Sequence, residues 1–208
     1  MSSAEAAKFN MIEQQIRPWE VLDYRVLSTL DAIDRSNFVP EAYRGLAYAD
    51  CQIPLGNGVF MLPPTVEGRM LQALLIEADD EVLEVGCGCG YVSACLAHLA
   101  RRVTSVAGDP EILAAAEKNL AAAGLSNVDF EQAGLAQLER EQAYDAIAVT
   151  ASLERVPANL KQALRTGGRM FVIVGHSPVM QALLISRVSA NEWTSQSLFE
   201  TDLPRLAG

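Results

Sequence analysis

The chain has 208 residues, half of them hydrophobic and a fifth charged, which is a globular composition rather than a disordered or fibrous one. Its 16 basic residues are scattered and are outnumbered by 26 acidic ones, giving a net charge of −10. Nucleic-acid-binding proteins gain affinity from clustered cations, so DNA or RNA is not the expected partner. No apolar run approaches the roughly 20 residues of a membrane span, and no signal peptide is visible, so we expect a cytoplasmic protein without a membrane partner.

The first third of the chain differs from the rest. Residues 4–16 and 20–33 are predicted to be helices, because apolar residues recur three and four positions apart. Residues 46–64 contain three prolines and two glycines and show no helical period, which predicts an irregular segment with short strands. A loop of this length in a compact domain is usually functional or forms a lid. We therefore expect residues 1–64 to form a helical cap and a loop on the substrate side.

From residue 65 onward, predicted strands and helices alternate. The strands are expected at 81–85, 103–107, 127–131, 144–150 and 170–175, and the helices at 66–76, 92–100, 110–123 and 158–164. Residues 180–189 and 193–200 are predicted to form a terminal hairpin. Alternation of this kind predicts a doubly wound α/β fold. We expect a seven-stranded, mostly parallel Rossmann-like sheet, with the antiparallel C-terminal hairpin at one edge, in a single domain spanning residues 1–208.

A glycine-rich turn, Gly86-x-Gly88-x-Gly90, follows the first of these strands. Open α/β sheets bind ligands at the carboxyl ends of their strands, and glycine lets the backbone approach a ligand closely. The dinucleotide fingerprint G-x-G-x-x-G does not fit, because Tyr91 stands at its third glycine position.

The cysteines of the turn raise a second possibility, a metal site. Cys87, Cys89 and Cys95 with His98 are a conceivable ligand set. The C-x-C spacing is tighter than that of structural zinc sites and no second pair follows, so we expect small buried residues and no metal.

The turn resembles the first motif of class I S-adenosylmethionine-dependent methyltransferases, with Glu84 as the acidic residue that precedes it. A run of ordered motifs over residues 10–175 narrows the resemblance to the protein-L-isoaspartate O-methyltransferase family. The motifs are Ile16-Arg-Pro18, Phe38-Val-Pro40, Ala47-Tyr-Ala-Asp50, Ile53-Pro-Leu-Gly56, Val82-Leu-Glu-Val-Gly86, Tyr144-Asp-Ala-Ile-Ala-Val-Thr150 and Gly167-Gly-Arg-Met-Phe-Val-Ile-Val-Gly175.

The resemblance implies an enzyme that methylates a carboxylate of damaged protein, or a related acceptor, with S-adenosylmethionine as cofactor. It implies direct in-line displacement without a metal or a covalent intermediate. The cofactor-binding residues that it implies are Glu84, Gly86, Cys87, Gly88, Gly90, Ala107, Gly108, Gly134 and Leu135.

The sequence departs from the family pattern on both sides of the expected site. On the acceptor side, Leu62 stands at the position of a family hydroxyl residue and Val59 at that of a glutamine. Thr65 is expected to open the next helix, Asp50 either contacts substrate or caps a turn, and the catalytic residue is left unassigned.

On the cofactor side, the second strand ends in Ala107 where the family has an acid for the ribose hydroxyls. Asp109 follows with Pro110 behind it, which favours a helix N-cap over a ribose contact. The family's Gly-Asp-Gly reads Ala133-Gly134-Leu135.

Two alternatives to this enzyme follow from these departures. A hydrogen bond to a charged acceptor contributes about 1.5–3 kcal/mol, so losing two acids weakens cofactor binding on the order of 10²–10⁴-fold. The first alternative is therefore a degenerate methyltransferase fold acting as a binding protein, unless Asp109 or the backbone compensates, and the second is an enzyme with a different acceptor. A nicotinamide oxidoreductase is disfavoured, because the third fingerprint glycine and the ribose-binding acid are both missing. A substrate carboxylate is already ionised at neutral pH, so loss of the hydroxyl residue is the lesser change.

Overall fold

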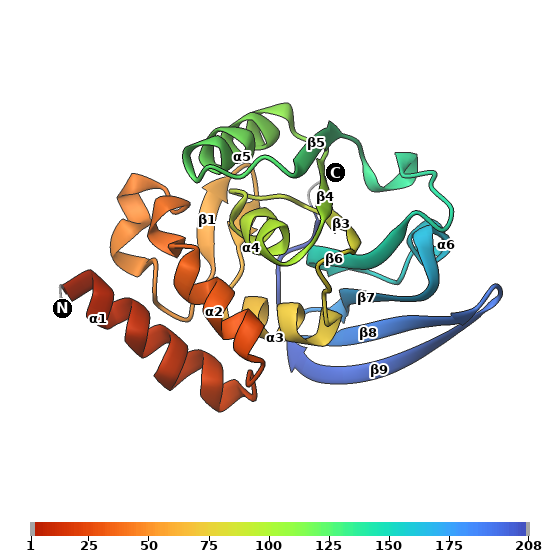
Figure 1. Cartoon of the computed structure of the whole chain (residues 1–208), viewed down its shortest axis with the longest axis horizontal. Coiled ribbons are helices and arrows are strands. Elements are labelled where there is room, and N and C mark those ends of the chain that lie inside the picture. Colours follow the sequence, from red (N-terminus) through yellow and green to blue (C-terminus); the bar gives the residue numbers. More distant parts are fainter. Residues whose placement is uncertain (1–2, 207–208) are drawn as a thin grey trace.

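A seven-stranded sheet with the order β5-β4-β3-β6-β7-β8-β9 organises the chain in a computed structural model that describes residues 3–206 (Figure 1). Strands β3 to β7 run parallel, and β8 and β9 close one edge in antiparallel pairing. The strand bounds are β3 Glu81–Val85, β4 Arg102–Ala107, β5 Val128–Gln132, β6 Tyr144–Leu153, β7 Leu164–His176, β8 Val179–Ser189 and β9 Glu192–Thr201. The predicted fold class is confirmed, including the terminal hairpin.

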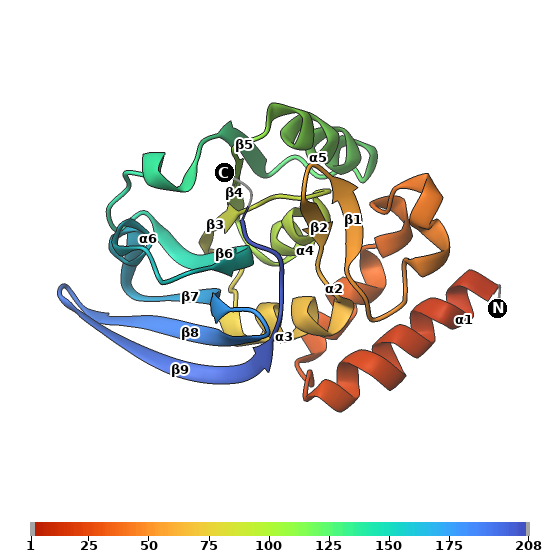
Figure 2. The same ribbon diagram turned by 180° about the vertical axis from the view of Figure 1, so that it is seen from behind.

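Helices cover both faces of this sheet (Figure 2). The helices are α3 Pro64–Leu74, α4 Tyr91–Leu99, α5 Pro110–Ala122 and α6 Ala158–Ala163. Side chains alternate across each strand. In β3, Val82 joins the cluster that contains residues of α3 and α4, whereas Leu83 and Val85 join the cluster on the α6 side. The strand order reverses between β3 and β6, because β4 and β5 lie on one side of β3 and β6 lies on the other. A ligand crevice is expected at the carboxyl ends of the strands at this point.

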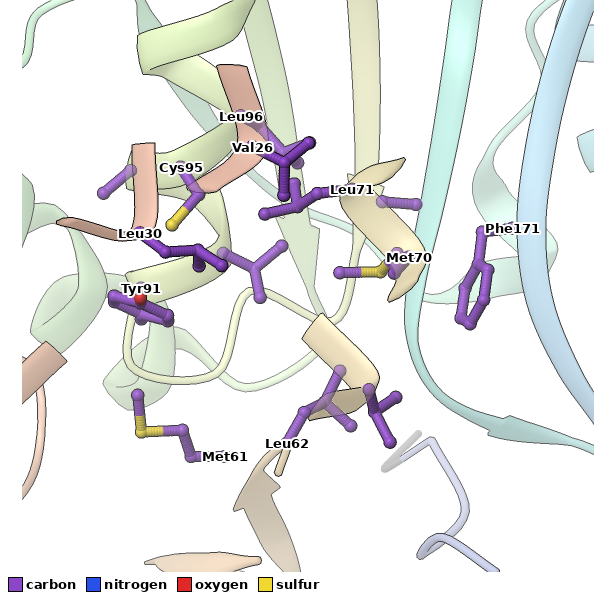
Figure 3. Packing of buried hydrophobic residues seen from close by; sticks show 14 of the residues in the cluster. Val26, Leu30, Met61, Leu62, Met70, Leu71, Tyr91, Cys95, Leu96 and Phe171 are labelled. Atoms are coloured by element: carbon purple, nitrogen blue, oxygen red, sulfur yellow. The ribbon is translucent and has the colours of Figure 1, made fainter. Parts of the chain in front are cut away.

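The N-terminal cap is built from helices and a small hairpin. The helix α1 Ser3–Asn10 continues as a wider π-helical segment, Met11–Ile16, and a 3₁₀ turn, Arg17–Trp19. The remaining elements are α2 Tyr24–Ala32, the 3₁₀ segments Arg35–Asn37 and Glu41–Leu46, and the antiparallel pair β1 Ile53–Gly56 and β2 Val59–Met61. Figure 3 shows Val26 and Leu30 of α2 packed beside Leu71 of α3 and Cys95 and Leu96 of α4. The predicted cap and the short strands of residues 46–64 are therefore present.

Some boundaries differ from those predicted. The second helix begins at Tyr24 and not at residue 20, because the Asp23 side chain caps it by accepting the backbone N–H of Arg25. Gln72 accepts the N–H groups of Leu22 and Asp23 at 2.6 and 2.9 Å, which fixes residues 20–23 as a turn. The predicted strand at 170–175 spans Leu164–His176, so it starts directly after α6. The extra length of β7 depends on pairing with its neighbouring strands, which local sequence patterns do not encode.

A separate observation concerns helix length. Within residues 3–206, no helix is both long enough and apolar enough to cross a membrane.

Candidate cofactor site

A pocket opens at the carboxyl ends of β3, β4 and β6. Its position is the point where the strand order reverses, where open α/β sheets bind their ligands. Strand ends, the β1–β2 hairpin, the β5–β6 connection and the C-terminal segment all contribute walls. The lining includes residues 58–62, 85–86, 106–109, 133–135, 150–151 and 203–206.

The glycine turn forms the floor of this pocket, and its backbone conformation explains the residue type. Gly86 has φ +97°, and a Cβ there would lie 2.7 Å from the Thr150 hydroxyl oxygen. Gly88 has φ +50° and also lines the pocket. A side chain at either position is strained, and its absence leaves backbone exposed to a ligand. Gly90 is outside the pocket lining, and a Cβ there would approach Leu120 to 2.6 Å, so its glycine serves the packing of α4 on α5.

Glu84 lies beneath the glycine turn with none of its surface exposed. Its Oε2 accepts hydrogen bonds from the hydroxyls of Ser93 and Ser105, whereas Oε1 has no hydrogen-bond partner within the described residues 3–206. Burial raises the pKa of the carboxyl to about 7, and the two serine hydroxyls act in the opposite direction. An orphaned buried carboxylate oxygen at a glycine turn fits the ammonium of the methionine part of S-adenosylmethionine.

The opposite end of the pocket carries the residues expected at the adenosine. Ala107, Gly108, Gly134 and Leu135 all line it, so their predicted contact with the cofactor is sterically open and stays a prediction. Ile112, Ala133 and Leu135 make this wall apolar, which suits a flat aromatic base.

Asp109 also lines the pocket, with both of its carboxylate oxygens engaged. Oδ1 accepts the backbone N–H of Glu111 at 2.8 Å, so the predicted N-cap of α5 is present. Oδ2 accepts from the side-chain amide of Asn57 at 2.9 Å. These two hydrogen bonds hold the pKa of Asp109 below its usual value, the one from Asn57 most strongly.

The side expected to receive the acceptor is formed by Phe60, Met61 and Leu62, of which Met61 and Leu62 are buried and Phe60 is exposed. All three line the pocket, and Met61 and Leu62 also belong to the buried core cluster that contains Tyr91 (Figure 3). Asp50 lies outside the lining, where its Oδ1 accepts from the Thr65 hydroxyl at 2.7 Å at the start of α3. The capping alternative for Asp50 thus matches its contacts, and Thr65 opens the helix as expected.

Sequence reasoning missed two parts of the site. Thr150 donates its hydroxyl to the carbonyl oxygens of Val85 and Gly86, so β6 holds the glycine turn in place. Residues 203–206 cover one side of the pocket, tied by hydrogen bonds from Ser152 to the carbonyls of Leu203 and Pro204. Thr150 could have been found from the sequence, because it is a threonine near the carboxyl end of the fourth parallel strand. Residues 203–206 carry no such sequence signal.

The cysteines in and after the turn, Cys87, Cys89 and Cys95, are buried free thiols. Among the described residues 3–206, no cluster of three His, Cys, Asp or Glu side chains could hold a metal ion. Burial raises the pKa of all three thiols, that of Cys89 to about 12, so they remain protonated at neutral pH.

A doubly wound sheet, a glycine turn over a buried acid and an apolar base-sized wall together define a Rossmann-like methyltransferase that uses S-adenosylmethionine. The sequence profile of the protein-L-isoaspartate(D-aspartate) O-methyltransferase family matches residues 6–201. The chain belongs to this family.

Individual relatives agree with that assignment. A protein-L-isoaspartate O-methyltransferase 2 of Marinobacter nauticus is 36% identical over 200 residues, covering 95% of this chain and 91% of the relative. A protein-L-isoaspartate O-methyltransferase of Rhodopseudomonas palustris is 34% identical and covers 95% and 92% of the two chains. A crystal structure of a Plasmodium falciparum chain assigned to the same enzymes, in complex with S-adenosyl-L-homocysteine, has a TM-score of 0.81 at 17% identity and covers 100% and 99% of the two chains. That last likeness supports the fold.

Proposed function

We propose that this protein transfers the methyl group of S-adenosylmethionine to the side-chain carboxylate of L-isoaspartyl residues in proteins or peptides. The observation that carries the proposal is the family match over residues 6–201, on a chain that retains the glycine turn and Glu84. Proteins and peptides that contain isoaspartate are the proposed partners, and the four free cysteines agree with a proposed location in the reducing cytoplasm.

In this mechanism the chain binds, orients and excludes water. Glu84 and the backbone of the glycine turn hold the methionine part of the cofactor, and the wall around Ile112 and Leu135 holds the base. The bound cofactor supplies an electrophilic methyl group on a sulfonium. The acceptor carboxylate enters beside Phe60, Met61 and Leu62, whose apolar side chains displace the water that otherwise solvates it.

The leucine at position 62 is compatible with this chemistry. A carboxylate is ionised at neutral pH, so its attack on a methyl group needs no proton removal by the enzyme. What the reaction needs is approach in line with the bond that breaks. Arg35 donates to the carbonyl oxygen of Leu62 at 2.5 Å and so fixes the hairpin backbone at this point.

The first test is calorimetric titration of the protein with S-adenosylhomocysteine. We expect micromolar binding in the wild-type protein. Gly134→Phe is the blocked variant, because Gly134 lines the pocket and has an ordinary φ, so a side chain fills the pocket without straining the backbone. Gly45→Phe is the matched control, since a Cβ at Gly45 meets nothing within 4 Å.

The second test is methyl transfer from radiolabelled S-adenosylmethionine to an isoaspartyl peptide and to the same peptide with ordinary aspartate. The proposal expects labelling of the isoaspartyl peptide, lost in Gly134→Phe and kept in Gly45→Phe. Cofactor binding without labelling contradicts the proposed acceptor and favours another one. No binding of S-adenosylhomocysteine up to millimolar concentration supports the degenerate fold instead.

A further inference from the structure

A smaller cavity continues from the cofactor pocket beneath the glycine turn. The two share the wall formed by residues 60–62, Gly86, Gly88 and Thr150. Glu67 and Glu84 line only the smaller cavity, together with Cys87. Its free space holds about one water-sized group.

Glu67 is buried here without full hydrogen bonding. Its side chain is 1% exposed and its Oε2 accepts a hydrogen bond from Arg35, which is itself fully buried. Among residues 3–206, the other oxygen, Oε1, has no hydrogen-bond partner, and neither has Oε1 of Glu84. Two buried carboxylates that line a single small cavity therefore each keep one unpaired acceptor, and the Tyr91 hydroxyl in the same lining and the Nε of Arg35 are unpaired as well. Unsatisfied buried acceptors are unfavourable unless a ligand or water completes them.

The charges around this cavity select the kind of group that completes it. Arg35 and Glu67 together are neutral, and Glu84 adds a negative charge when ionised. No lysine, arginine or histidine is among the described residues that line the cavity. A carboxylate placed here would be repelled, whereas an ammonium group has the charge, the three donors and the size of a water molecule.

We propose that Glu67 is a second anchor, beside Glu84, for the α-ammonium of the methionine part of S-adenosylmethionine. The family motif points to an acid only at the end of β3, whereas Glu67 comes from α3. Its role is to favour ligands that carry the α-ammonium over ligands that lack it. The inference rests on the cofactor use within the proposed function and is independent of which acceptor is methylated. In this role Glu67 contacts the cofactor and takes no part in proton transfer.

The test compares two ligands on one variant by calorimetry. S-adenosylhomocysteine carries the α-ammonium, and 5′-methylthioadenosine has the same adenosine and sulfur without it. Glu67→Gln keeps the shape and an oxygen for Arg35 but removes the charge. We expect Glu67→Gln to weaken S-adenosylhomocysteine about 10- to 100-fold, the range of a charge-assisted hydrogen bond, and to leave 5′-methylthioadenosine within a factor of two. Glu117→Gln, on the exposed face of α5, should change neither affinity.

Two outcomes overturn the inference. Equal weakening of both ligands shows that Glu67 only supports the fold through Arg35, and unchanged binding of S-adenosylhomocysteine shows that it makes no contact. If Glu67→Gln fails to fold, Glu67→Asp keeps a charge for Arg35, leaves the hydrogen bond from Arg35 to Leu62 in place and withdraws the carboxylate from the cavity, and it gives the same ligand comparison. A wild-type protein that binds neither ligand refutes the cofactor site itself, which separates failure of the proposed function from failure of this inference.

Discussion

At the scale of single residues, Glu84 is in an unfavourable position for stability. It is fully buried, it accepts hydrogen bonds from the hydroxyls of Ser93 and Ser105, and its pKa rises from 4.5 to about 7 because burial disfavours the charged form. Between these values the folded protein binds a proton that the unfolded chain has released. The contribution of Glu84 to stability is therefore present below pH 4.5 and is lost as the pH rises through 7. A carboxylate kept in this position at neutral pH points to a ligand with positive charge.

The affinity for a positively charged ligand should rise with pH, whereas the contribution of Glu84 to stability falls. An ammonium binds the ionised carboxylates, and Glu84 and Glu67 both have a pKa of about 7. We therefore expect the affinity for S-adenosylhomocysteine to rise about tenfold for each of them, about 100-fold together, as the pH rises from 6 to 8. Glu84→Gln should bind more weakly, with a smaller pH dependence, because Glu67, whose pKa is also raised to about 7, still titrates. Calorimetry at several pH values measures both effects. A flat wild-type profile would show that these carboxylates do not titrate against the ligand.

At the scale of elements, the β1–β2 hairpin is a wall of the pocket held at two points. Arg35 holds its base at the carbonyl oxygen of Leu62. Its tip is Asn57, with φ +50° between two glycines that also have positive φ, and the Asn57 amide donates to Asp109 at 2.9 Å. The hydrogen bond therefore joins the hairpin to the N-cap of α5, two residues after Ala107 at the end of β4.

Removing this contact should open the pocket without removing any atom of its floor. We expect Asn57→Gly, which removes the amide and keeps the positive φ without strain, to raise the dissociation rate of S-adenosylhomocysteine several-fold, because the exposed tip loses its hydrogen bond and the floor is unchanged. Stopped-flow displacement with excess ligand measures this rate. Asn10→Ala, on the exposed end of α1, is the matched control. Equal dissociation rates in both variants would mean that the hairpin does not limit ligand release.

The elements that sequence could predict are those with local signals. The glycine turn follows a run of β-branched residues, and Asp109-Pro110 is a recognisable helix start, so both were placed correctly. Glu67 and residues 203–206 reach the site only through contacts with distant parts of the chain. Glu67 meets Arg35 across 32 positions, and Ser152 bonds Leu203 across 51. Nothing in their immediate sequence distinguishes them from an exposed helix position or a C-terminal tail.

At the scale of the whole molecule, the cap and the sheet share one hydrophobic core. Met11, Ile16 and Leu30 of the cap belong to the same buried cluster as Val82 and Phe171 of the sheet. Polar contacts add to this: the Gln72 side chain of α3 donates to the carbonyl oxygen of Glu20 at 2.7 Å and accepts from the backbone N–H of Leu22. Neither the cap nor the α3 face can be separated without exposing this core to water.

The cap and the core should therefore unfold together. Trp19 lies in the cap, edge-on to Phe199 at 6.0 Å between ring centroids, and Trp193 lies in the terminal hairpin, donating its ring N–H to the carbonyl oxygen of Lys161. Trp193→Phe leaves fluorescence from the cap, and Trp19→Phe leaves fluorescence from the hairpin. Circular dichroism on each variant supplies its own global reference and corrects for any change in stability caused by the substitution. We expect the fluorescence and dichroism midpoints in urea to coincide within each variant, as in a two-state transition of one domain spanning residues 1–208. A cap fluorescence midpoint at lower urea than the dichroism midpoint would contradict this expectation. It would mean that residues 1–64 unfold separately from the sheet, and that the shared core does not form in one step.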